Sequence, residues 1–132
     1  MRLTPKTKVR RTALIERPWK ITLGELTVVG DQAALRGQAT ITVGDRCVIS
    51  QLAILTTCCR NPSRAGFPLE SGPITIRDDC WVAADTLVMP GVTIEEGTVV
   101  GARALVENNL PGWTVAAGQP ATPRKQRVMN PS

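Results

Sequence analysis

The sequence predicts an all-β fold, a parallel β-helix wound from short strands, and two observations support this prediction. Branched aliphatic residues recur with a period of six, and a small or medium residue follows each of them four places later. Only 3 Trp and 1 Phe are aromatic, so the core must be built in thin layers from small and branched side chains. Neither a helix nor a simple alternating strand produces this double register.

The longest unbroken run of repeats lies in the second half of the chain. Its hexads begin at Ile76, Val82, Val88, Ile94, Val100 and Val106. Their companions four places on are Cys80, Thr86, Val92, Thr98, Ala104 and Leu110. If three hexads close one triangular turn, stacked coils lie about 4.8 Å apart. Ile76 should then pack between Val43 of one coil and Ile94 of the next.

The first half of the chain fits the same template. Its hexads begin at Leu23, Val29, Leu35, Val43, Ile49 and Leu55, with companions at Thr27, Ala33, Ala39, Cys47, Ala53 and Cys59. The step from Leu35 to Val43 is eight residues, which indicates a two-residue bulge near Thr40 to Thr42. Turn-forming pairs occur where corners are required, at Gly24-Glu25, Gly30-Asp31, Gly44-Asp45 and Pro90-Gly91. Together the two halves predict a helix of about four coils.

The repeat lapses over residues 61–75, a stretch rich in proline and glycine. A long loop in an otherwise economical repeat usually carries function. The alternative is a surface insertion that the fold tolerates. We therefore expect one long loop excursion, followed after the last hexads by a short C-terminal extension.

Charge is divided unevenly along the chain. Residues 1–17 hold six basic residues and one acid, a net charge of +5, and Arg124, Lys125 and Arg127 add +3. The middle, 18–123, carries 7 basic and 10 acidic residues, a net charge of −3. Neither basic end has interleaved aromatic residues, so nucleic-acid binding is not expected. We predict a solvated basic N-terminal segment at 1–17, and a β-helix domain with a C-terminal tail at 18–132.

The chain has no apolar run long enough to span a bilayer, which favours a cytoplasmic protein. Its four cysteines lack the paired spacing of metal ligands, and no metal is expected. Cys47 and Cys80 should occupy adjacent rungs of one inward column, between Thr27 and Thr98. We interpret both as small core residues, with a disulfide or redox pair as the alternative.

Several motifs resemble the hexapeptide-repeat acyltransferases, above all the colanic-acid-type and the maltose and galactoside O-acetyltransferases. They include Pro18-Trp19-Lys20, Phe67-Pro68-Leu69, Cys80-Trp81-Val82-Ala83-Ala84, Pro90-Gly91-Val92-Thr93-Ile94 and the run from Pro111 to Ala121. The resemblance covers residues 18–127 in order. It implies a left-handed coil, a homotrimer, and acyl-CoA bound in grooves between neighbouring subunits. It also implies acetyl transfer from acetyl-CoA to a hydroxyl of a sugar or polysaccharide.

In that family a loop histidine removes the proton from the acceptor hydroxyl, because imidazole is basic near neutral pH. Here Arg60 holds that position, between Cys59 and Asn61, and the chain has no histidine at all. Arginine stays protonated and cannot serve as the base. The catalytic group is therefore unknown. Metal-dependent enzymes of this fold that need three histidine ligands are excluded by the same count.

Two alternatives remain beside this interpretation. Cys58 or Cys59 could supply a thiolate, because the cation of Arg60 lies next to them in sequence. The chain could also be a catalytically inactive trimeric β-helix that binds CoA or a protein partner. The two functional classes differ at Arg60, where a histidine would create transfer activity on a competent scaffold.

The resemblance also assigns cofactor-binding positions. Trp81 would border the pantetheine arm, Ala84 and Ala102 would offer backbone groups, and Lys125, with Arg124 beside it, would meet the CoA phosphates. Where relatives commonly have Val-Thr-Lys-Asp, this chain has Val106-Glu107-Asn108-Asn109, which places an acid near the cofactor path. The alternative for these residues is a frayed basic tail and an exposed tryptophan.

Overall fold

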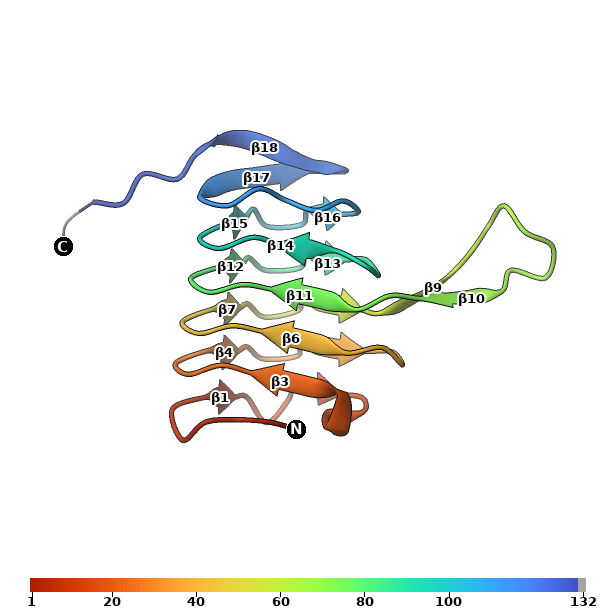
Figure 1. Ribbon diagram of the computed structural model, residues 1–132, viewed down its shortest axis with the longest axis horizontal. Coiled ribbons are helices and arrows are strands. Elements are labelled where there is room, and N and C mark those ends of the chain that lie inside the picture. Colours follow the sequence, from red (N-terminus) through yellow and green to blue (C-terminus); the bar gives the residue numbers. More distant parts are fainter. Residues whose placement is uncertain (131–132) are drawn as a thin grey trace.

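The computed structural model of the protein describes residues 1–130. The chain winds into a three-sided stack of coils, with the N-terminus at its base and the last two strands covering its top (Figure 1). Each coil contributes one short strand to each of three sheets, except that the first coil joins one sheet only through the bridge between Arg2 and Thr22, and within the coils these strands are parallel. The all-β parallel β-helix predicted from the hexads is confirmed. Over residues 1–130, no helix is long and apolar enough to cross a membrane.

The three sheets are named A, B and C in the order in which each coil visits them. Sheet A holds β3 (Ile21–Leu23), β6 (Ile41–Val43), β11 (Ile74–Ile76) and β14 (Thr93–Ile94). Sheet B holds β1 (Lys8–Val9), β4 (Val28–Val29), β7 (Val48–Ile49), β12 (Trp81–Val82), β15 (Val99–Val100), β17 (Thr114–Gly118) and β18 (Ala121–Gln126). Sheet C holds β2 (Leu14–Ile15), β5 (Ala34–Arg36), β8 (Ile54–Thr56), β13 (Leu87–Val88) and β16 (Leu105–Val106).

The core is a set of aliphatic columns that run up the inside of the stack. Ile76 pairs with Val43 below and with Ile94 above, as the hexads predict. All three side chains are buried, Ile76 with 1 % of its surface exposed. Each inward aliphatic side chain therefore packs on another aliphatic side chain in the neighbouring coil. Parallel backbone hydrogen bonds join the same coils.

The small inward residues form a second kind of column at the corner between sheets A and B. Thr27, Cys47, Cys80 and Thr98 are buried in successive coils. The thiols of Cys47 and Cys80 donate to the carbonyl oxygens of Arg77 at 3.0 Å and Glu95 at 3.1 Å. Both cysteines are buried in the core, which supports their interpretation as packing residues.

Most corners use a left-handed residue three places after the inward aliphatic. Leu26, Arg46 and Asp79 take φ values of 61°, 56° and 60° there, although none is glycine. The corner residue Gly91 is itself left-handed, with φ 81°, whereas Gly24, Gly30 and Gly44 are needed for a different reason. A Cβ on Gly30 would lie 2.8 Å from the backbone nitrogen of Gln51 in the next coil, so glycine permits the coils to approach closely.

The stack has five coils rather than the predicted four, because residues 1–17 form a coil of their own. Lys8 pairs with Val28, and Leu14 pairs with Ala34. Arg10 forms an ion pair with Asp31 at 3.1 Å, and this contact, together with Thr12, holds the pKa of Asp31 below its usual value. The expectation of a solvated N-terminal segment is therefore wrong, since the six-residue pattern continues before Pro18, where Val9 and Ile15 pack against the core.

Two boundaries also differ from the sequence-based prediction. The extra residues after Leu35 form the bend at 37–39, ahead of β6, rather than a bulge at 40–42. The long excursion is a β-hairpin, here called the arm, in which β9 (Cys58–Arg60) pairs antiparallel with β10 (Leu69–Ser71). Since Ile74 is already a buried residue of sheet A, the excursion ends before residue 75. Figure 1 shows the arm projecting away from the stack.

The stacking predicts a specific energetic cost for losing one inward side chain. Ile76→Ala should lower the free energy of unfolding by about 2–5 kcal/mol, because the coils on either side hold the cavity open. Chemical denaturation followed by circular dichroism measures this change. Thr42→Ala, an exposed position of sheet A, is the matched control and should change stability little. Equal effects of the two substitutions would contradict this account of the core.

Candidate functional site

The predicted site residues lie in two separate parts of one chain. Arg60, Cys59 and Asn61 belong to the arm, which leaves the stack at the corner between sheets C and A, the C–A corner. Ala84 and Ala102 lie at the corner between sheets B and C, the B–C corner, and Trp81 lies on sheet B. Within a single chain, the structure does not bring the arm and the cofactor positions together.

Arg60 is exposed on the arm and is engaged by the arm itself. One of its guanidinium nitrogens donates to the carbonyl oxygen of Phe67 at 3.1 Å. Its backbone lies opposite Leu69 in the hairpin register. A guanidinium held in this way stabilises the arm and has no lone pair with which to accept a proton.

The other face of the arm carries Cys59 and a carboxylate that sequence reasoning missed. Glu70 lies directly opposite Cys59 across the hairpin. Asn61 donates from its Nδ2 atom to Oε1 of Glu70 at 2.7 Å, and its own Oδ1 accepts from the backbone of Ser63. The antiparallel register between residues 58–60 and 69–71 creates this contact, and the hexad pattern, which lapses there, gives no signal for it.

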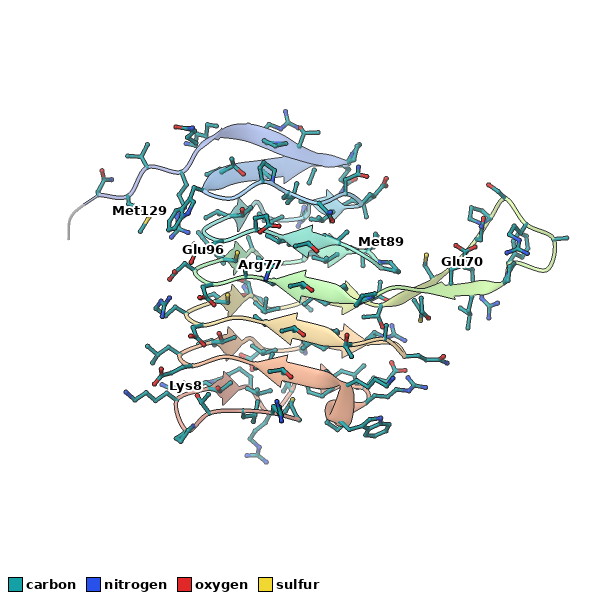
Figure 2. The ribbon with its side chains drawn as sticks, viewed as in Figure 1. Lys8, Glu70, Arg77, Met89, Glu96 and Met129 are labelled. Carbon is teal, nitrogen blue, oxygen red and sulfur yellow. The ribbon has the colours of Figure 1, made fainter. Side chains whose placement is uncertain are left out.

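A shallow groove lies between the arm and the neighbouring coils at the C–A corner. It is lined by Cys59, Glu70, Ser71, Gly72, Met89, Pro90, Gly91 and Glu107. Figure 2 shows Glu70 on the arm and Met89 at the edge of the stack from which the arm leaves. The groove thus joins the arm to the segment 106–109, which the resemblance places near the cofactor path.

Trp81 presents a broad apolar surface on sheet B. Its side chain is half exposed, at 49 %, and the indole nitrogen donates to Oγ of Ser50 at 2.9 Å. Its backbone is paired between Val48 of the coil below and Val99 of the coil above. The ring is therefore oriented by a hydrogen bond while its surface stays accessible to a ligand.

Ala84 and Ala102 follow Trp81 toward the B–C corner. Ala102 is exposed and Ala84 is half-buried. The carbonyl oxygen of Ala84 accepts from the backbone nitrogen of Arg103 at 2.9 Å, and Gln119 donates to the carbonyl oxygen of Arg103 at 2.7 Å. Short side chains leave the backbone of this corner open to approach, as a cofactor bound through main-chain groups requires.

The basic C-terminal residues have two different roles. Arg124 and Lys125 are exposed residues of β18, which pairs with β17, so they do not belong to a frayed tail. Arg124 donates to the carbonyl oxygen of Ala117 at 3.1 and 3.2 Å. Arg127 instead donates to the carbonyl oxygens of Asp79 and Gly97 and lies 5.6 Å from the centre of the Trp113 ring. Arg127 fastens the end of the chain to the stack.

The cysteines fall into two environments. Cys58 and Cys59 are partly buried on the arm, whereas Cys47 and Cys80 lie inside the stack. Contact with the Cys47 thiol, reinforced by burial, raises the pKa of the Cys80 thiol well above its ordinary value. Among residues 1–130 there is no group of three or more histidine, cysteine, aspartate or glutamate side chains that could hold a metal ion.

Comparison with known proteins shows that the chain is similar to acetyltransferases with hexapeptide repeats. The family described as bacterial transferase hexapeptide, with six repeats, matches residues 73–108. The Escherichia coli K12 protein WcaF, named for acetyl transfer in colanic acid biosynthesis, is 42 % identical over 120 residues. That alignment covers 91 % of this chain and 66 % of the relative. The chain therefore spans about two-thirds of the length of this relative.

Solved structures share the fold over almost the whole chain. A maltose O-acetyltransferase from Clostridium difficile 630 superposes with a TM-score of 0.89 at 22 % identity, over 97 % of this chain and 70 % of the other. A galactoside acetyltransferase in complex with coenzyme A superposes with a TM-score of 0.80 at 25 % identity, over 90 % and 64 % of the two chains. The coil of this protein is the left-handed β-helix of these acetyltransferases.

The two cysteine environments predict a split in chemical reactivity. In the native protein, iodoacetamide should alkylate Cys58 and Cys59, while Cys47 and Cys80, with 0 % and 2 % of their surface exposed, should stay unmodified. Peptide mass spectrometry of the labelled protein measures this pattern. All four cysteines should react once the chain is unfolded. Native labelling of Cys80 would contradict the buried column, and native protection of both arm thiols would exclude a thiolate mechanism.

Proposed function

Because the chain belongs to the hexapeptide-repeat transferase family, we propose that it transfers an acetyl group from acetyl-CoA to a hydroxyl of a sugar or polysaccharide. The observation that supports this function best is the strip of accessible groups formed by Trp81, Ala84, Ala102 and the basic pair Arg124 and Lys125. Each matches a cofactor-binding position of the family. The proposal places acetyl-CoA as co-substrate and gives no role to a metal or to nucleic acid.

Each part of this strip suits one part of the cofactor. The half-exposed ring of Trp81 offers an apolar wall for the pantetheine arm. The short side chains of Ala84 and Ala102 leave the main chain sterically accessible to the amide groups of pantetheine, and the carbonyl oxygen of Ala84 is already bonded to the backbone nitrogen of Arg103. Arg124 and Lys125 carry fixed positive charge on β18, where the phosphates of CoA would be attracted.

We propose a homotrimer as the working form. The arm and the cofactor strip lie at different corners of one chain, so a complete site needs the arm of one copy beside the strip of another. The outward residues of sheets B and C are mostly apolar, unlike the threonines on sheet A. They include Val28, Val48, Val99 and Val115 on sheet B and Ile54, Leu87 and Leu105 on sheet C. Apolar faces of this kind favour contact between copies in the cytoplasm.

A second candidate function is a catalytically inactive β-helix that binds CoA or a protein partner. The observation that favours it is Arg60, which occupies the position of the family's base and donates to the carbonyl oxygen of Phe67. The two functions share the cofactor strip and differ in chemistry. Two measurements therefore separate them, one on binding and one on transfer.

Binding is tested by calorimetric titration of the purified protein with acetyl-CoA. We expect saturable binding with one cofactor per subunit, and Lys125→Ala should weaken it up to about fivefold, the usual range for an exposed charge pair. Lys20→Ala, the same substitution at an exposed residue of the 3-10 turn Pro18–Lys20, is the matched control and should leave affinity unchanged. No detectable binding at millimolar acetyl-CoA would exclude both functions that involve CoA.

Transfer is tested by restoring the imidazole. Arg60→His should raise the rate of acetyl transfer at least about tenfold, because general base catalysis typically contributes 100-fold or more. Chromatography of CoA released in the presence of methyl glucoside and methyl galactoside measures the rate. Arg64→His, which places histidine elsewhere on the arm, should have no effect. If Arg60→His binds acetyl-CoA and transfers nothing, the inactive alternative is favoured.

A further inference from the structure

The B–C corner changes in character from the base of the stack to its top. The second residue after each inward aliphatic of sheet B lies at this corner. From the first coil upward these residues are Arg11, Asp31, Gln51, Ala84 and Ala102. The upper two are the short residues of the proposed cofactor strip, whereas the lower three carry a cation, a carboxylate and an amide. The corner therefore joins the cofactor positions to a polar surface in the coils beneath them.

Two adjoining hollows occupy the polar part of the B–C corner. One has a volume of about 690 Å³ and spans the lowest three coils, with Gln51 and Leu52 from the third of them in its wall. The other has a volume of about 620 Å³, and its wall includes Arg11. Both hollows are lined by Arg10, Thr12 and Asp31. Their volumes fall in the range of sites that bind small molecules.

A hydrogen-bonded network fixes the groups that the two hollows share. Arg10 donates from its Nε atom to Oδ1 of Asp31 at 3.1 Å, and the hydroxyl of Thr12 donates to the same oxygen at 3.0 Å. The backbone nitrogen of Gln32 donates to the hydroxyl oxygen of Thr12 at 3.0 Å. Since Arg10 and Thr12 hold the pKa of Asp31 below its usual value, its carboxylate is charged at neutral pH. The two lowest coils thus present a fixed carboxylate beside a fixed guanidinium.

The network leaves both donors and acceptors free to meet a ligand. Within residues 1–130, Oδ2 of Asp31 and the Nη atoms of Arg10 make no hydrogen bond. The same is true of the side chains of Arg11, Gln32 and Gln51 across the described chain. A guanidinium donates to a carboxylate, a carboxylate accepts from hydroxyls, and an amide does both. The hollows therefore combine a cation for an acid with partners for sugar hydroxyls.

The charge around the hollows favours an anionic ligand. Residues 1–17 carry six basic residues and one acid, Glu16, which pairs with Arg17 and Arg36 at the C–A corner. Figure 2 shows Lys8 at the base of the stack. The backbone of duplex DNA offers phosphates without hydroxyl donors, and the carboxylate of Asp31 repels it. An acidic sugar carries both a carboxylate and hydroxyls, so it matches the mixed charge of this corner.

The proposed cofactor strip gives the B–C corner a direction. Arg124 and Lys125 lie on β18 at the top of the stack, and Ala102 and Ala84 lie in the coils under it. A CoA molecule whose phosphates meet β18 therefore directs its thioester end toward the lower coils. Gln51 lies one coil below Ala84, about 4.8 Å along the stack. The hollows thus begin where the acetyl group ends.

We infer that the lowest three coils of the B–C corner hold the acceptor, and that the acceptor is an acidic sugar unit, a pyranose with a carboxylate. This inference rests on the proposed function. The carboxylate of the sugar binds Arg11 and the free Nη atoms of Arg10. Its hydroxyls donate to Oδ2 of Asp31 and bond with the amide of Gln51, while Leu52 contacts the C–H face of the ring. These residues position the acceptor and take no part in proton transfer.

The test is calorimetric titration with an α-1,4-linked trimer of galacturonic acid and with the galactose trimer of the same linkage, which differ only in their carboxylates. Wild-type protein should bind the acidic trimer saturably and the neutral trimer at least about fivefold more weakly. Arg11→Gln should weaken binding of the acidic trimer about fivefold and leave the affinity for acetyl-CoA unchanged. Arg2→Gln removes the same charge from the same coil on the side of sheet A, where Arg2 bridges to Thr22, and should change neither affinity.

The outcomes separate this inference from the proposed function. Equal binding of the two trimers overturns the inference, and so does an equal loss in Arg11→Gln and Arg2→Gln, which indicates attraction by the whole basic coil. A short DNA duplex that binds as tightly as the acidic trimer at the same salt concentration also overturns it. If acetyl-CoA binds and the acidic trimer does not, the inference fails and the proposed function stands. If only the acidic trimer binds, the proposed function fails and the acceptor role fails with it.

Transfer gives the supporting readout. CoA should be released faster with the acidic trimer than with the neutral one. Arg11→Gln should raise KM for the acidic trimer about fivefold with kcat unchanged, because it removes a binding contact and leaves the reacting groups in place. A fall in kcat with unchanged KM would contradict a role in acceptor binding.

Discussion

The whole structure depends on one constraint, that each coil must place its inward side chains directly over those of the coil below. Parallel ladders at about 4.8 Å fix the distance between coils, and the aliphatic columns fix their rotation. A coil with an extra residue on one face would turn every later side chain out of register. The chain meets this constraint by confining its irregular steps to one corner. Ile15 to Leu23, Leu35 to Val43 and Leu55 to Ile76 all cross the C–A corner.

The arm follows from the same constraint. Because the stack accepts extra chain only at a corner, the longest step, from Leu55 to Ile76, leaves as a hairpin and returns in register. Its backbone is paired within itself, so it can project from the stack without leaving a row of open hydrogen-bonding groups. The groove with Glu70 and Glu107 lies where the arm leaves the coils. The groove thus exists because the fold accommodates extra residues only at this corner.

Stacking also explains how residues of the arm can vary while the fold is kept. The inward positions of the stack are buried aliphatic and small residues, and each is restrained by two neighbouring coils. Arg60 is an exposed arm residue whose guanidinium donates to the carbonyl oxygen of Phe67 in the same arm. It lies outside the buried core cluster of the described chain, so substitution there leaves the columns untouched. Chemistry in this fold is therefore separable from stability.

The sequence by itself determined the coil and its register, because the burial of one aliphatic side chain in every six residues is visible in the sequence as a six-residue repeat. It correctly placed Ile76 between Val43 and Ile94, and Cys47 and Cys80 in one buried column. It also singled out Arg60 by resemblance. It misjudged residues 1–17, since charged outward side chains masked the inward Val9 and Ile15 that pack against the core.

Only the tertiary structure decided where the outward and loop residues meet. Asn61 and Glu70 are nine residues apart and come together through the register of a hairpin whose turn follows no repeat. Arg127 reaches Asp79 and Gly97 across 48 and 30 residues, which separates it from Arg124 and Lys125. Such contacts are formed by side chains outside the core, partly buried at Asn61 and Arg127, whose partners are set by the path of the backbone. The periodic pattern that encodes the core does not constrain them.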